Sequence, residues 1–466
     1  MSSILTGAAM AFPEARLPCE EEFFRNVIDR CAEIYRGEPP WAYTRKSGLY
    51  GKGERRISQL GCAKVLCDSL ASLTFSGQAD IHCGDREQRE FALRILQENS
   101  FWEMAPAFFS RAYALGGGAL KIYIEGGKVC IDYVSAEQFI PTGNGRGGIC
   151  EGIFESSFLR SGRRYSLFEK HSMEKGHVVI DRKLYEKRNG AYSPVLVEEV
   201  FEGLGEHSEL SQMDVPMFAY FRPSGDNNMA DGSLLGLGCF ANCTDTLKAL
   251  DIAFDSFSRE FILGRKRIIV PSSCIRTVVD PDTGRISRYF DADDEVYQAL
   301  KCDEEQDLKI TDNTCELRVS EHVDAINALL DILCFQSGLS SGTLSFNSSA
   351  GVRTAAEIKS METRTEITMQ ANRCLAAELI ENTVRCIIRC GQMCGELPRG
   401  EVNVRAEFSD RQTVDKSEII DRTVKLTEAG LMSRVSAVMT VLDCSEADAV
   451  AELDKIRKEK EDKIYE

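Results

Sequence analysis

The sequence lacks the short patterns that mark most active sites and metal sites. Its five histidines are too scattered for a zinc site or a Ser-His-Asp triad, and no G-x-S-x-G nucleophile elbow occurs. Among 18 cysteines there is no C-x-x-C pair. We therefore expect no catalytic residue, no bound metal and no cofactor.

Long apolar stretches are missing too. No run approaches the roughly 18 residues that a membrane span needs, and residues 1–19 have no basic segment of the kind that opens a signal peptide. The cysteines are irregularly spaced in a chain of 466 residues, which is too large for a disulfide scaffold. We expect no membrane association, and reduced thiols in a cytoplasmic compartment.

Basic residues are fewer than acidic ones. With 56 Lys and Arg against 73 Asp and Glu, the formal net charge is −17, although the turn-rich segment 43–56 is locally basic. A protein that grips nucleic acid over a broad surface needs a basic field, so this class is disfavoured. A protein that DNA only passes through is not excluded, because it needs few fixed phosphate contacts.

Three local patterns could carry chemistry, and each has a simpler interpretation. Residues 143–148 match G-x-G-x-x-G, but a strand-like segment follows them instead of a helix, which favours a loop between strands. The three glycines at 116–118 lack the G-K-[ST] of a P-loop and suit a strand entry or bend. Cys386, Cys390 and Cys394 share a helix face without a fourth ligand, which favours core packing over metal binding.

The first half of the chain changes from helical to strand periodicity. Helical patterns are predicted over 20–36 and, as two helices, over 86–115. A β-hairpin is predicted over 119–134, and short strands follow, including one at Val195–Val200 and a last one at Phe218–Phe221. These patterns indicate an α+β lobe with an antiparallel meander.

Two helical stretches with matched spacing bracket a β-rich insert. Residues 233–263 repeat apolar side chains in alternating steps of three and four, and residues 320–337 return to that spacing. Both stripes suit either ordinary buried helices or helices that pack on other subunits. The insert, 264–319, has acidic clusters at 291–295 and 303–307 that lack a calcium-loop pattern and suit a solvated or partner-binding face.

A very long helix is predicted after a polar Gly/Ser loop. Residues 353–394 contain no proline, and no glycine before Gly391. At about 1.5 Å per residue this helix would be roughly 60 Å long. Its first half is too polar for the core of a monomer and should face water, a cavity or other subunits, whereas residues from Cys374 onward should enter the core.

The order of these segments resembles that of portal proteins of tailed double-stranded DNA bacteriophages, of the type found in siphophages of Gram-positive hosts. The most specific residues are the G-L-S-S-G-T-L-S-F phrase at 338–346 and the T-A-A-E-I helix start at 354–358. Residues 34–35, 41–43 and 116–121 are similar to the family as well. The resemblance covers nearly the whole chain and implies an α+β portal fold that forms a ring, usually of twelve subunits.

The resemblance also implies a division of the chain into the regions of a portal subunit. These are a wing at 1–232, stem helices at 233–263 and 320–338, a clip at 264–319, a tunnel loop at 339–352, a long helix and wing strand at 353–411, and a helical crown at 412–466.

Three groups of residues are then candidates for function. The tunnel-loop residues expected to project into the channel and touch DNA are Leu344, Ser345, Phe346, Asn347, Ser348 and Ser349. Candidate basic channel contacts are Arg353, Lys359 and Arg364, which could equally pair with Glu357, Glu362 and Glu366 on the same helix. The acidic residues expected to form a partner surface on the clip are Asp291, Asp293, Asp294, Glu295, Asp303, Glu304 and Glu305.

The function implied by the resemblance is passive conduction. The ring would stand at a capsid vertex of the virion after assembly in the host cytoplasm, while a terminase large subunit drives DNA through it. Head-completion or adaptor proteins would later replace the motor, scaffolding and major capsid proteins would surround the ring, and DNA would leave by the same route. Two alternatives remain open, namely a soluble oligomeric scaffold unrelated to DNA and an enzyme whose site residues are not contiguous.

Overall fold

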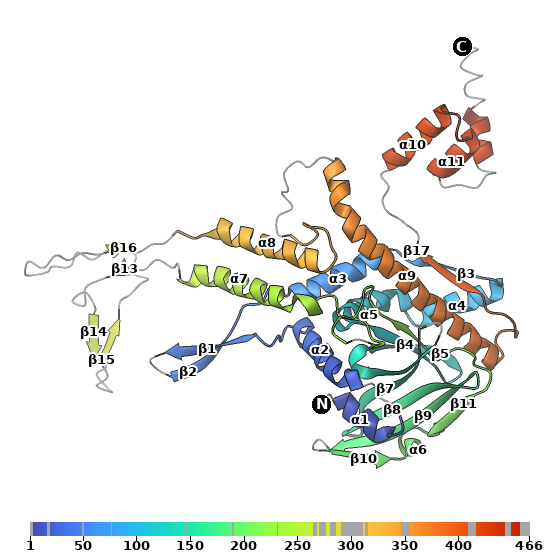
Figure 1. Cartoon of the computed structure of the whole chain (residues 1–466), viewed down its shortest axis with the longest axis horizontal. Helices are drawn as coiled ribbons and strands as arrows, with labels where there is room; N and C mark the ends of the chain where they lie inside the picture. The colour runs from blue at the N-terminus through green and yellow to red at the C-terminus, as the bar shows by residue number, and fades with distance from the viewer. Residues whose placement is uncertain are drawn as a thin grey trace, which may run out of the picture. The chain divides into compact units, whose positions relative to one another are not determined.

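The structure is a computed structural model of the chain (Figure 1). It describes residues 3–15, 19–48, 51–75, 77–145, 148–188, 191–230, 232–263, 268–269, 276–279, 286–289, 311–312, 316–345, 355–408, 416–442 and 449–456. The chain forms two compact units, of which the first holds Met1–Phe75 with Ile81–Arg405, and the second holds Ser76–Asp80 with Ala406–Glu466.

Five helices form the N-terminal part of the first unit. They are α1 (Ser3–Ala11), α2 (Cys19–Tyr35), α3 (Cys62–Thr74), α4 (Arg86–Glu98) and α5 (Phe101–Leu115). The helices expected over 20–36 and 86–115 are confirmed. Asp85 caps α4 by accepting a 3.0 Å hydrogen bond from the backbone N–H of Glu87. Phe109 and Tyr113 of α5 are buried in the core between these helices and a small sheet.

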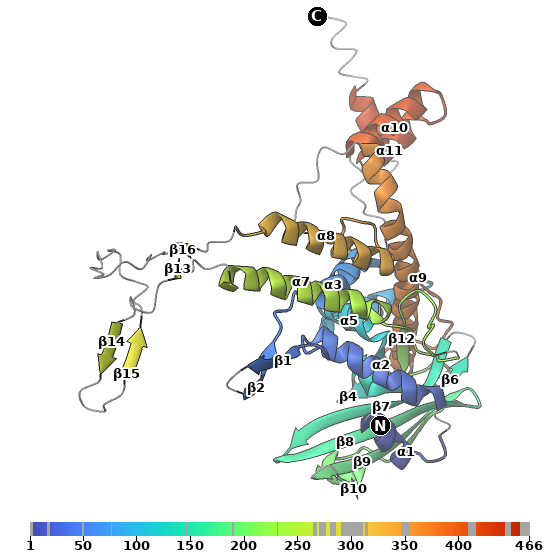
Figure 2. The same cartoon turned by 60° about the vertical axis from the view of Figure 1, so that its left-hand side comes forward.

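The segment 43–56 is a β-hairpin, although its composition indicated only turns. Strands β1 (Tyr43–Gly48) and β2 (Gly51–Arg56) pair antiparallel, with Tyr43 opposite Arg56 and Gly48 opposite Gly51. They form a two-stranded sheet of their own and extend beside the helix α7 (Figures 1 and 2). Cross-strand hydrogen bonding therefore holds a segment that the apolar pattern alone does not mark as a strand pair.

A three-stranded sheet lies against α5. The predicted hairpin is confirmed as β4 (Gly118–Glu125) and β5 (Lys128–Ser135), and β12 (Phe218–Phe221) pairs with β4. The order is β12-β4-β5, so Phe218–Phe221 is a strand as expected but belongs to a different sheet from the meander.

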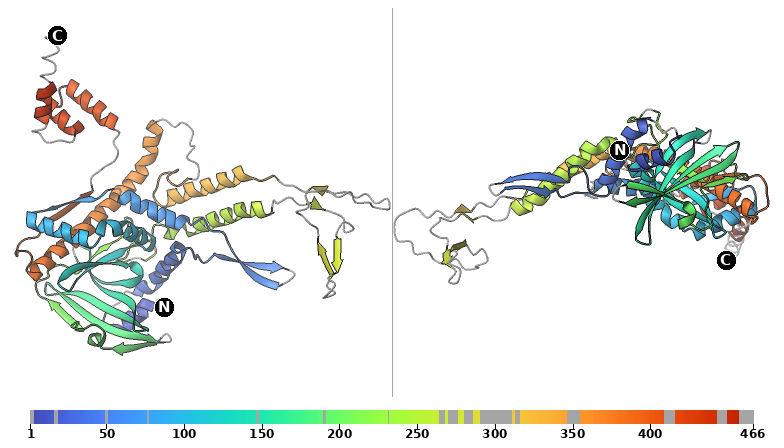
Figure 3. Two further views of the ribbon diagram at one scale, coloured as in Figure 1. Left: turned by 180° about the vertical axis from the view of Figure 1, so that it is seen from behind. Right: turned by 90° about the horizontal axis from the view of Figure 1, so that it is seen from below.

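The meander is a six-stranded antiparallel sheet, best seen in Figure 3. Its strands are β6 (Phe139–Gly145), β7 (Gly148–Arg160), β8 (Arg163–Glu174), β9 (His177–Arg188), β10 (Ala191–Val195) and β11 (His207–Leu210). The loop expected at 143–148 is paired strand at Gly143–Gly145, which end β6, and at Gly148, which begins β7, and residues 146 and 147 lie outside the described residues. The strand expected at Val195–Val200 is wrong, because the chain leaves the sheet at Val195 and forms the short helix α6 (Val197–Val200).

Two helices run side by side and bracket the insert. They are α7 (Thr244–Leu263), preceded by a 3-10 turn at Ala241–Cys243, and α8 (Val319–Gln336) (Figures 1 and 2). The helix start expected near Ser233 is wrong, because the backbone there packs closely on the α5–β4 turn. A Cβ on Gly238 would lie 2.3 Å from the carbonyl oxygen of Ala114. Within the insert, the structure describes four short strands, β13 (Ile268–Ile269), β14 (Arg276–Val279), β15 (Ile286–Tyr289) and β16 (Thr311–Asp312).

The long helix is confirmed as α9 (Ala355–Cys394), with 40 residues. Its second half is buried as predicted, from Asn372 through Ile380 to Cys390, whereas the side chains of Thr363–Met369 are exposed or half-buried. Strand β17 (Val404–Phe408) follows and pairs with β3 (Ala79–Cys83), a strand that the sequence did not indicate.

The second unit is helical. It contains α10 (Lys416–Glu428) and α11 (Arg434–Leu442), which lie against each other. An apolar pocket beside these helices is lined by Ile420, Val424, Val438 and Val441. Gly430, with φ 69°, ends the first of these helices in the left-handed conformation that glycine allows at low cost. Within the described part of the chain, no helix is long and apolar enough to cross a membrane.

Candidate functional site

The G-L-S-S-G-T-L phrase forms a clasp between α8 and α9. We define the clasp as residues 338–344. Gly338 ends α8 with φ 79°, and its carbonyl oxygen accepts a 2.7 Å hydrogen bond from the hydroxyl of Thr368. The backbone N–H of Leu339 donates to the carbonyl of Cys334 at 2.8 Å. The phrase therefore ends one helix and binds the side of the next.

Two hydroxyls complete the clasp. The N–H of Ser340 donates to Oγ1 of Thr365 at 2.8 Å, and Oγ of Ser340 accepts from the N–H of Thr365 at 3.3 Å. On the α8 side, Oδ1 of Asp331 accepts the N–H of Gly342 at 2.8 Å. Because Ser340 is only 9% exposed, its two bonds with Thr365 are partly shielded from water, whereas the bond between Asp331 and Gly342 is exposed. Together they fix the start of the loop on both helices.

The predicted tunnel-loop residues fall on both sides of the clasp's end. Leu344 is 7% exposed, so in this protomer it is a packing residue and not an exposed contact. Ser345 follows it as an exposed residue. Phe346, Asn347, Ser348 and Ser349 lie outside the described residues, and the DNA contact expected of this segment stays a prediction.

The three predicted basic contacts are placed differently. Arg353 lies outside the described residues, and Lys359 is known only to belong to α9. Arg364 lies over the ring of Phe335, with 4.6 Å from Cζ to the ring centroid. This cation–π contact joins α8 to α9. The DNA contact and the ion pair within α9 that the sequence left open for Arg364 stay predictions.

The paired helices α7 and α8 are joined at both ends. Near the insert, Arg318 donates two 3.0 Å hydrogen bonds to the carboxylate of Glu260. At the other end, the hydroxyl of Thr246 donates to Oε1 of Gln336 at 2.8 Å. Between these two contacts the predicted apolar stripes of α7 and α8 face each other. Leu250 and Leu330, which lie further from the insert, are buried, whereas Phe261, near the insert, is 45% exposed.

Two aspartates of α7, one helical turn apart, hold the root of the β1–β2 hairpin. The carboxylate of Asp255 accepts two 2.6 Å hydrogen bonds from Arg55 and one of 3.0 Å from the N–H of Ser58. The carboxylate of Asp251 accepts the indole N–H of Trp41 at 2.8 Å and the N–H of Leu60 at 2.9 Å.

The surroundings of these aspartates differ. Hydrogen bonding to Arg55 lowers the pKa of Asp255 to about 2, whereas burial raises the pKa of Asp251.

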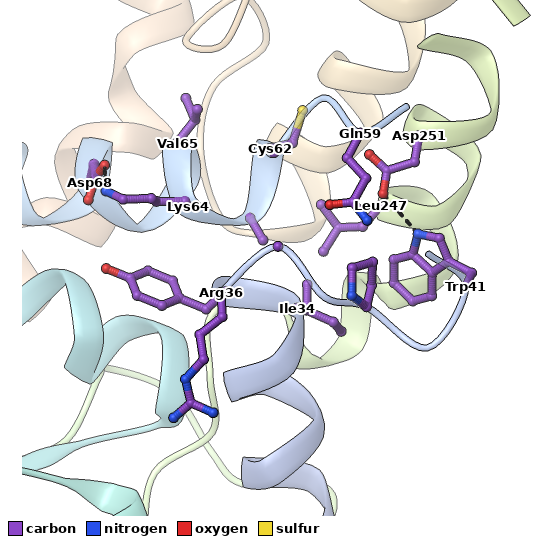
Figure 4. A pocket seen from close by; sticks show the side chains of 15 residues that line it. Ile34, Arg36, Trp41, Gln59, Cys62, Lys64, Val65, Asp68, Leu247 and Asp251 are labelled. Carbon is purple, nitrogen blue, oxygen red and sulfur yellow. Dashed lines mark hydrogen bonds and ion pairs between the residues drawn. The ribbon is translucent and has the colours of Figure 1, made fainter. Parts of the chain in front are cut away.

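Beside these aspartates a cavity of about 270 Å³ opens between the end of α2, the start of α3 and α7, and Trp41 and Leu247 line it (Figure 4). Sequence reasoning missed both aspartates, although acidic residues at i and i+4 inside an apolar stripe, with a basic segment elsewhere, could have indicated them.

A buried ionic cluster joins the meander to strand β4 and was also missed. Glu169 accepts hydrogen bonds from Lys121 at 2.6 Å and from Arg182 at 3.1 Å, and all three side chains are at most 10% exposed. Despite burial, the charge of Lys121 lowers the pKa of Glu169 to about 2. His171 lies next to this cluster, packed edge-on against Phe154 at 5.0 Å, and burial lowers its pKa to about 4.

The acidic residues at 291–295 and 303–305 lie outside the described residues, and the partner surface expected there stays a prediction. Cys386 and Cys390 are fully buried, and each thiol lies 3.9 Å from the sulfur of Met217. These two cysteines therefore pack in the core, as the sequence favoured. Over the described ranges, no group of three or more His, Cys, Asp or Glu side chains is arranged to hold a metal ion.

Comparison with known protein families gives one match over most of the chain. Residues 51–465 match the family described as phage portal protein, SPP1 Gp6-like. The match includes the clasp, α9 and the paired helices α7 and α8. No curated protein matches the chain.

Among solved structures, the chain resembles subunits of gene transfer agent particles. A chain from the neck of an empty particle, computed with C6 symmetry, is 10% identical with a TM-score of 0.44, over 90% of this chain and 93% of that one. A chain from the virion of the native particle is 10% identical with a TM-score of 0.41, over 81% of this chain and 88% of that one.

Proposed function

The chain belongs to the SPP1 Gp6-like family of phage portal proteins, and from this premise we propose that copies of it close into a ring around a channel for double-stranded DNA. As a member of that family, the protein is a head–tail connector. The family match over residues 51–465 is the observation that carries the proposal. A closed ring requires the same head-to-tail contact between every pair of neighbours.

Features of the protomer support an assembled state. Phe335, Ile332 and Ile367 are 64%, 47% and 64% exposed, although each is large and apolar. They lie on α8 and α9, whose other faces pack in the core. Large apolar side chains left on a helix pair are typical of surfaces that bind another protein.

We assign the expected regions to the fold as part of the same proposal. The wing is residues 1–232, the stem is α7 with α8, the clip is 264–319, and the crown is 412–466. Residues 339–352 form the tunnel loop. The clasp supports the last assignment, because it fixes the point at which this loop leaves the stem.

The partners belong to the proposal too. A terminase large subunit would drive DNA through the ring, an adaptor would replace it, and scaffolding and capsid proteins would surround the ring at a vertex of the virion. The net charge of −17 suits a conduit, because a bore with many fixed phosphate contacts would hold DNA in place. The siphophage type and the Gram-positive host stay predictions.

Electron microscopy of the purified protein, alone and co-expressed with a scaffolding protein, tests the ring. We expect ring-shaped particles with a central hole. A protein that stays monomeric under both conditions, at concentrations from nanomolar to tens of micromolar, would contradict the ring.

The acidic residues of the clip give a second test, of the partner surface. Reversing Asp291, Asp293, Asp294 and Glu295 to lysine should weaken binding of the terminase or adaptor, because rim charges steer association. Equal affinity for the variant and the wild-type ring would rule out this surface.

A further inference from the structure

Asp251, one helical turn before Asp255, is a buried carboxylate without a counter-charge. Its side chain accepts the indole N–H of Trp41 at 2.8 Å and the backbone N–H of Leu60 at 2.9 Å, and the residue is 7% exposed. Both of these donors are neutral. No lysine or arginine in the described part of the chain forms an ion pair with Asp251, whereas Asp255 is paired with Arg55. A buried carboxylate is costly unless a cation compensates its charge.

The carboxylate of Asp251 has room for such a cation. An ionised carboxylate offers about four acceptor positions, and the two neutral donors use two of them. Burial raises the pKa of Asp251, as expected when the surrounding protein does not fully stabilise the negative charge. A positively charged donor at the free positions would remove this cost.

Asp251 lines the cavity of about 270 Å³ described above. Figure 4 shows its side chain beside those of Gln59 and Trp41, at one end of the cavity. We call this end of the cavity the Asp251 pocket. It opens to the outside of a single protomer, and every residue that lines it lies in the described part of the chain.

The two basic residues that line the cavity are bound elsewhere. Arg36 donates hydrogen bonds of 2.5 and 2.7 Å to the carboxylate of Glu137, and the ammonium of Lys64 is paired with Asp68. In Figure 4 both basic side chains lie away from Asp251. The charge of Asp251 is therefore not compensated from within the cavity.

Gln59 provides a second polar group at the Asp251 pocket. Its amide nitrogen is buried and has no hydrogen-bond partner among the described residues. A buried polar group without a partner is uncommon in proteins and calls for an explanation. Half a turn about the last side-chain bond exchanges the amide nitrogen and oxygen, so Gln59 can also accept a hydrogen bond at this place.

The rest of the pocket is apolar. The ring of Trp41 lines it, together with Leu247 and Ile34, which are 3% and 7% exposed. Pockets that enclose whole small-molecule ligands usually measure about 300–1,000 Å³, so a cavity of about 270 Å³ suits a single long side chain better. An aliphatic stem would lie against the apolar wall while its polar head reaches the carboxylate.

We propose that the Asp251 pocket binds a guanidinium group on an aliphatic stem, as in an arginine side chain. The guanidinium donates to the free positions of Asp251 and to the oxygen of Gln59, and the stem covers Leu247. An ammonium fits less well, because the planar guanidinium stacks on aromatic rings such as that of Trp41 and is more weakly hydrated. The site goes beyond the proposed ring and does not depend on it, since one protomer supplies every residue.

The fluorescence of Trp41 reports binding directly. The chain has two tryptophans, so Trp102→Phe leaves Trp41 as the only one, and all measurements use this background. The probe is Nα-acetylarginine amide. The control ligand is the matching citrulline derivative, which has nearly the same shape and no charge.

We expect the arginine derivative to bind at least about tenfold more tightly than the citrulline derivative, because hydrogen bonds between charged groups are the stronger ones. Asp251→Asn should abolish this preference. Gln59→Glu adds a second carboxylate and should tighten binding of the arginine derivative several-fold, a gain that a misfolded protein cannot produce. Asp245→Asn changes an exposed carboxylate of the same helix and should bind as the parent protein does. Circular dichroism checks that each variant is folded.

Equal affinity for the arginine and citrulline derivatives would overturn the proposal, and so would a preference that persists in Asp251→Asn. Mass photometry with a saturating concentration of each derivative then identifies the source of the guanidinium. Rings lost only with the arginine derivative assign it to an arginine of the neighbouring copy, and rings that form normally assign it to a molecule outside the ring. A protein that binds the probe selectively and forms no ring would overturn the ring and leave this site standing.

Discussion

The carboxylate of Asp255 accepts two parallel hydrogen bonds, each 2.6 Å long, from the guanidinium of Arg55. The two residues are 200 positions apart in the sequence. Charge-assisted bidentate pairs of this kind are among the strongest hydrogen bonds in proteins, and the Asp255 side chain is only 9% exposed. The pair ties a basic hairpin to a helix of the proposed stem.

Replacing this aspartate should release the hairpin. In Asp255→Asn the neutral amide keeps one acceptor and loses the charge, so we expect the free energy of unfolding to fall by about 1–3 kcal/mol. Trypsin should then cut within residues 45–56 several times faster than in the wild type. Asp245→Asn, which changes an exposed carboxylate of the same helix, is the control. Equal cleavage rates in the two variants would contradict the prediction.

The ion pair between Asp255 and Arg55 should also be lost in acid. Because the pKa of Asp255 is lowered to about 2, its contribution to stability is complete above the unfolded value of 3.8 and is lost as the pH falls toward 2. Trypsin is inactive at such pH, so hydrogen exchange of the amide of Ser58, which donates to Asp255, measures this release.

His171 should make the protein sensitive to mild acid. Burial lowers its pKa from 6.5 to about 4, so the unfolded chain binds a proton between these values that the folded chain excludes. Stability is therefore lost as the pH falls from 7 to 5, by about 2 kcal/mol from this residue. In His171→Phe that part of the pH dependence should disappear, because phenylalanine does not titrate and both ring nitrogens of His171 lack a hydrogen-bond partner among the described residues.

Thermal unfolding of wild type and His171→Phe at several pH values between about 5 and 7.5 measures this effect. Glu169 does not interfere in that range, because its lowered pKa affects stability only below about 4.5. His82→Phe, on an exposed strand position, should keep the wild-type pH dependence. Parallel curves for wild type and His171→Phe would show that His171 is not the titrating group.

The clasp should be sensitive to a methyl group at Gly338. Gly338 and Gly395 both have φ 79°. A Cβ added at Gly338 would lie 3.0 Å from Oγ1 of Thr368, whereas a Cβ added at Gly395 would have no atom within 4 Å. Both alanine variants should lose about 1 kcal/mol for backbone strain, and Gly338→Ala should lose more because Thr368 must move away from its bond. Chemical denaturation compares the two variants, and equal losses would contradict a clasp role for Gly338.

Removing the loop beyond the clasp should separate assembly from DNA handling. We expect a chain that lacks residues 345–349 to form rings normally and to fail in packaging or retaining DNA. A variant with the same length but only glycine and serine there distinguishes loop length from the role of Phe346. Normal packaging by the deletion variant would rule out a channel role for this segment.

The sequence determined the element order because that order depends on local periodicity. Apolar residues at helical spacing marked the long helix α9, and alternation with Gly turns marked the meander. The family phrase at 338–346 also depends on residue order alone, which is why it could indicate a portal protein without any knowledge of tertiary contacts. Residues 233–240 were misjudged because their apolar spacing suits a helix, while close backbone packing on Ala114 prevents one.

Tertiary structure alone decided which residues meet. Asp255 and Arg55, or Glu169 and Lys121, are distant in sequence, and no spacing rule links them. Exposure is likewise a property of the fold. Leu344 was expected in the channel and is buried, whereas Phe335 is large and apolar and yet 64% exposed, next to Arg364. A local sequence pattern predicts which secondary structure a segment can form. Tertiary packing decides which face of that element stays exposed and can bind a partner.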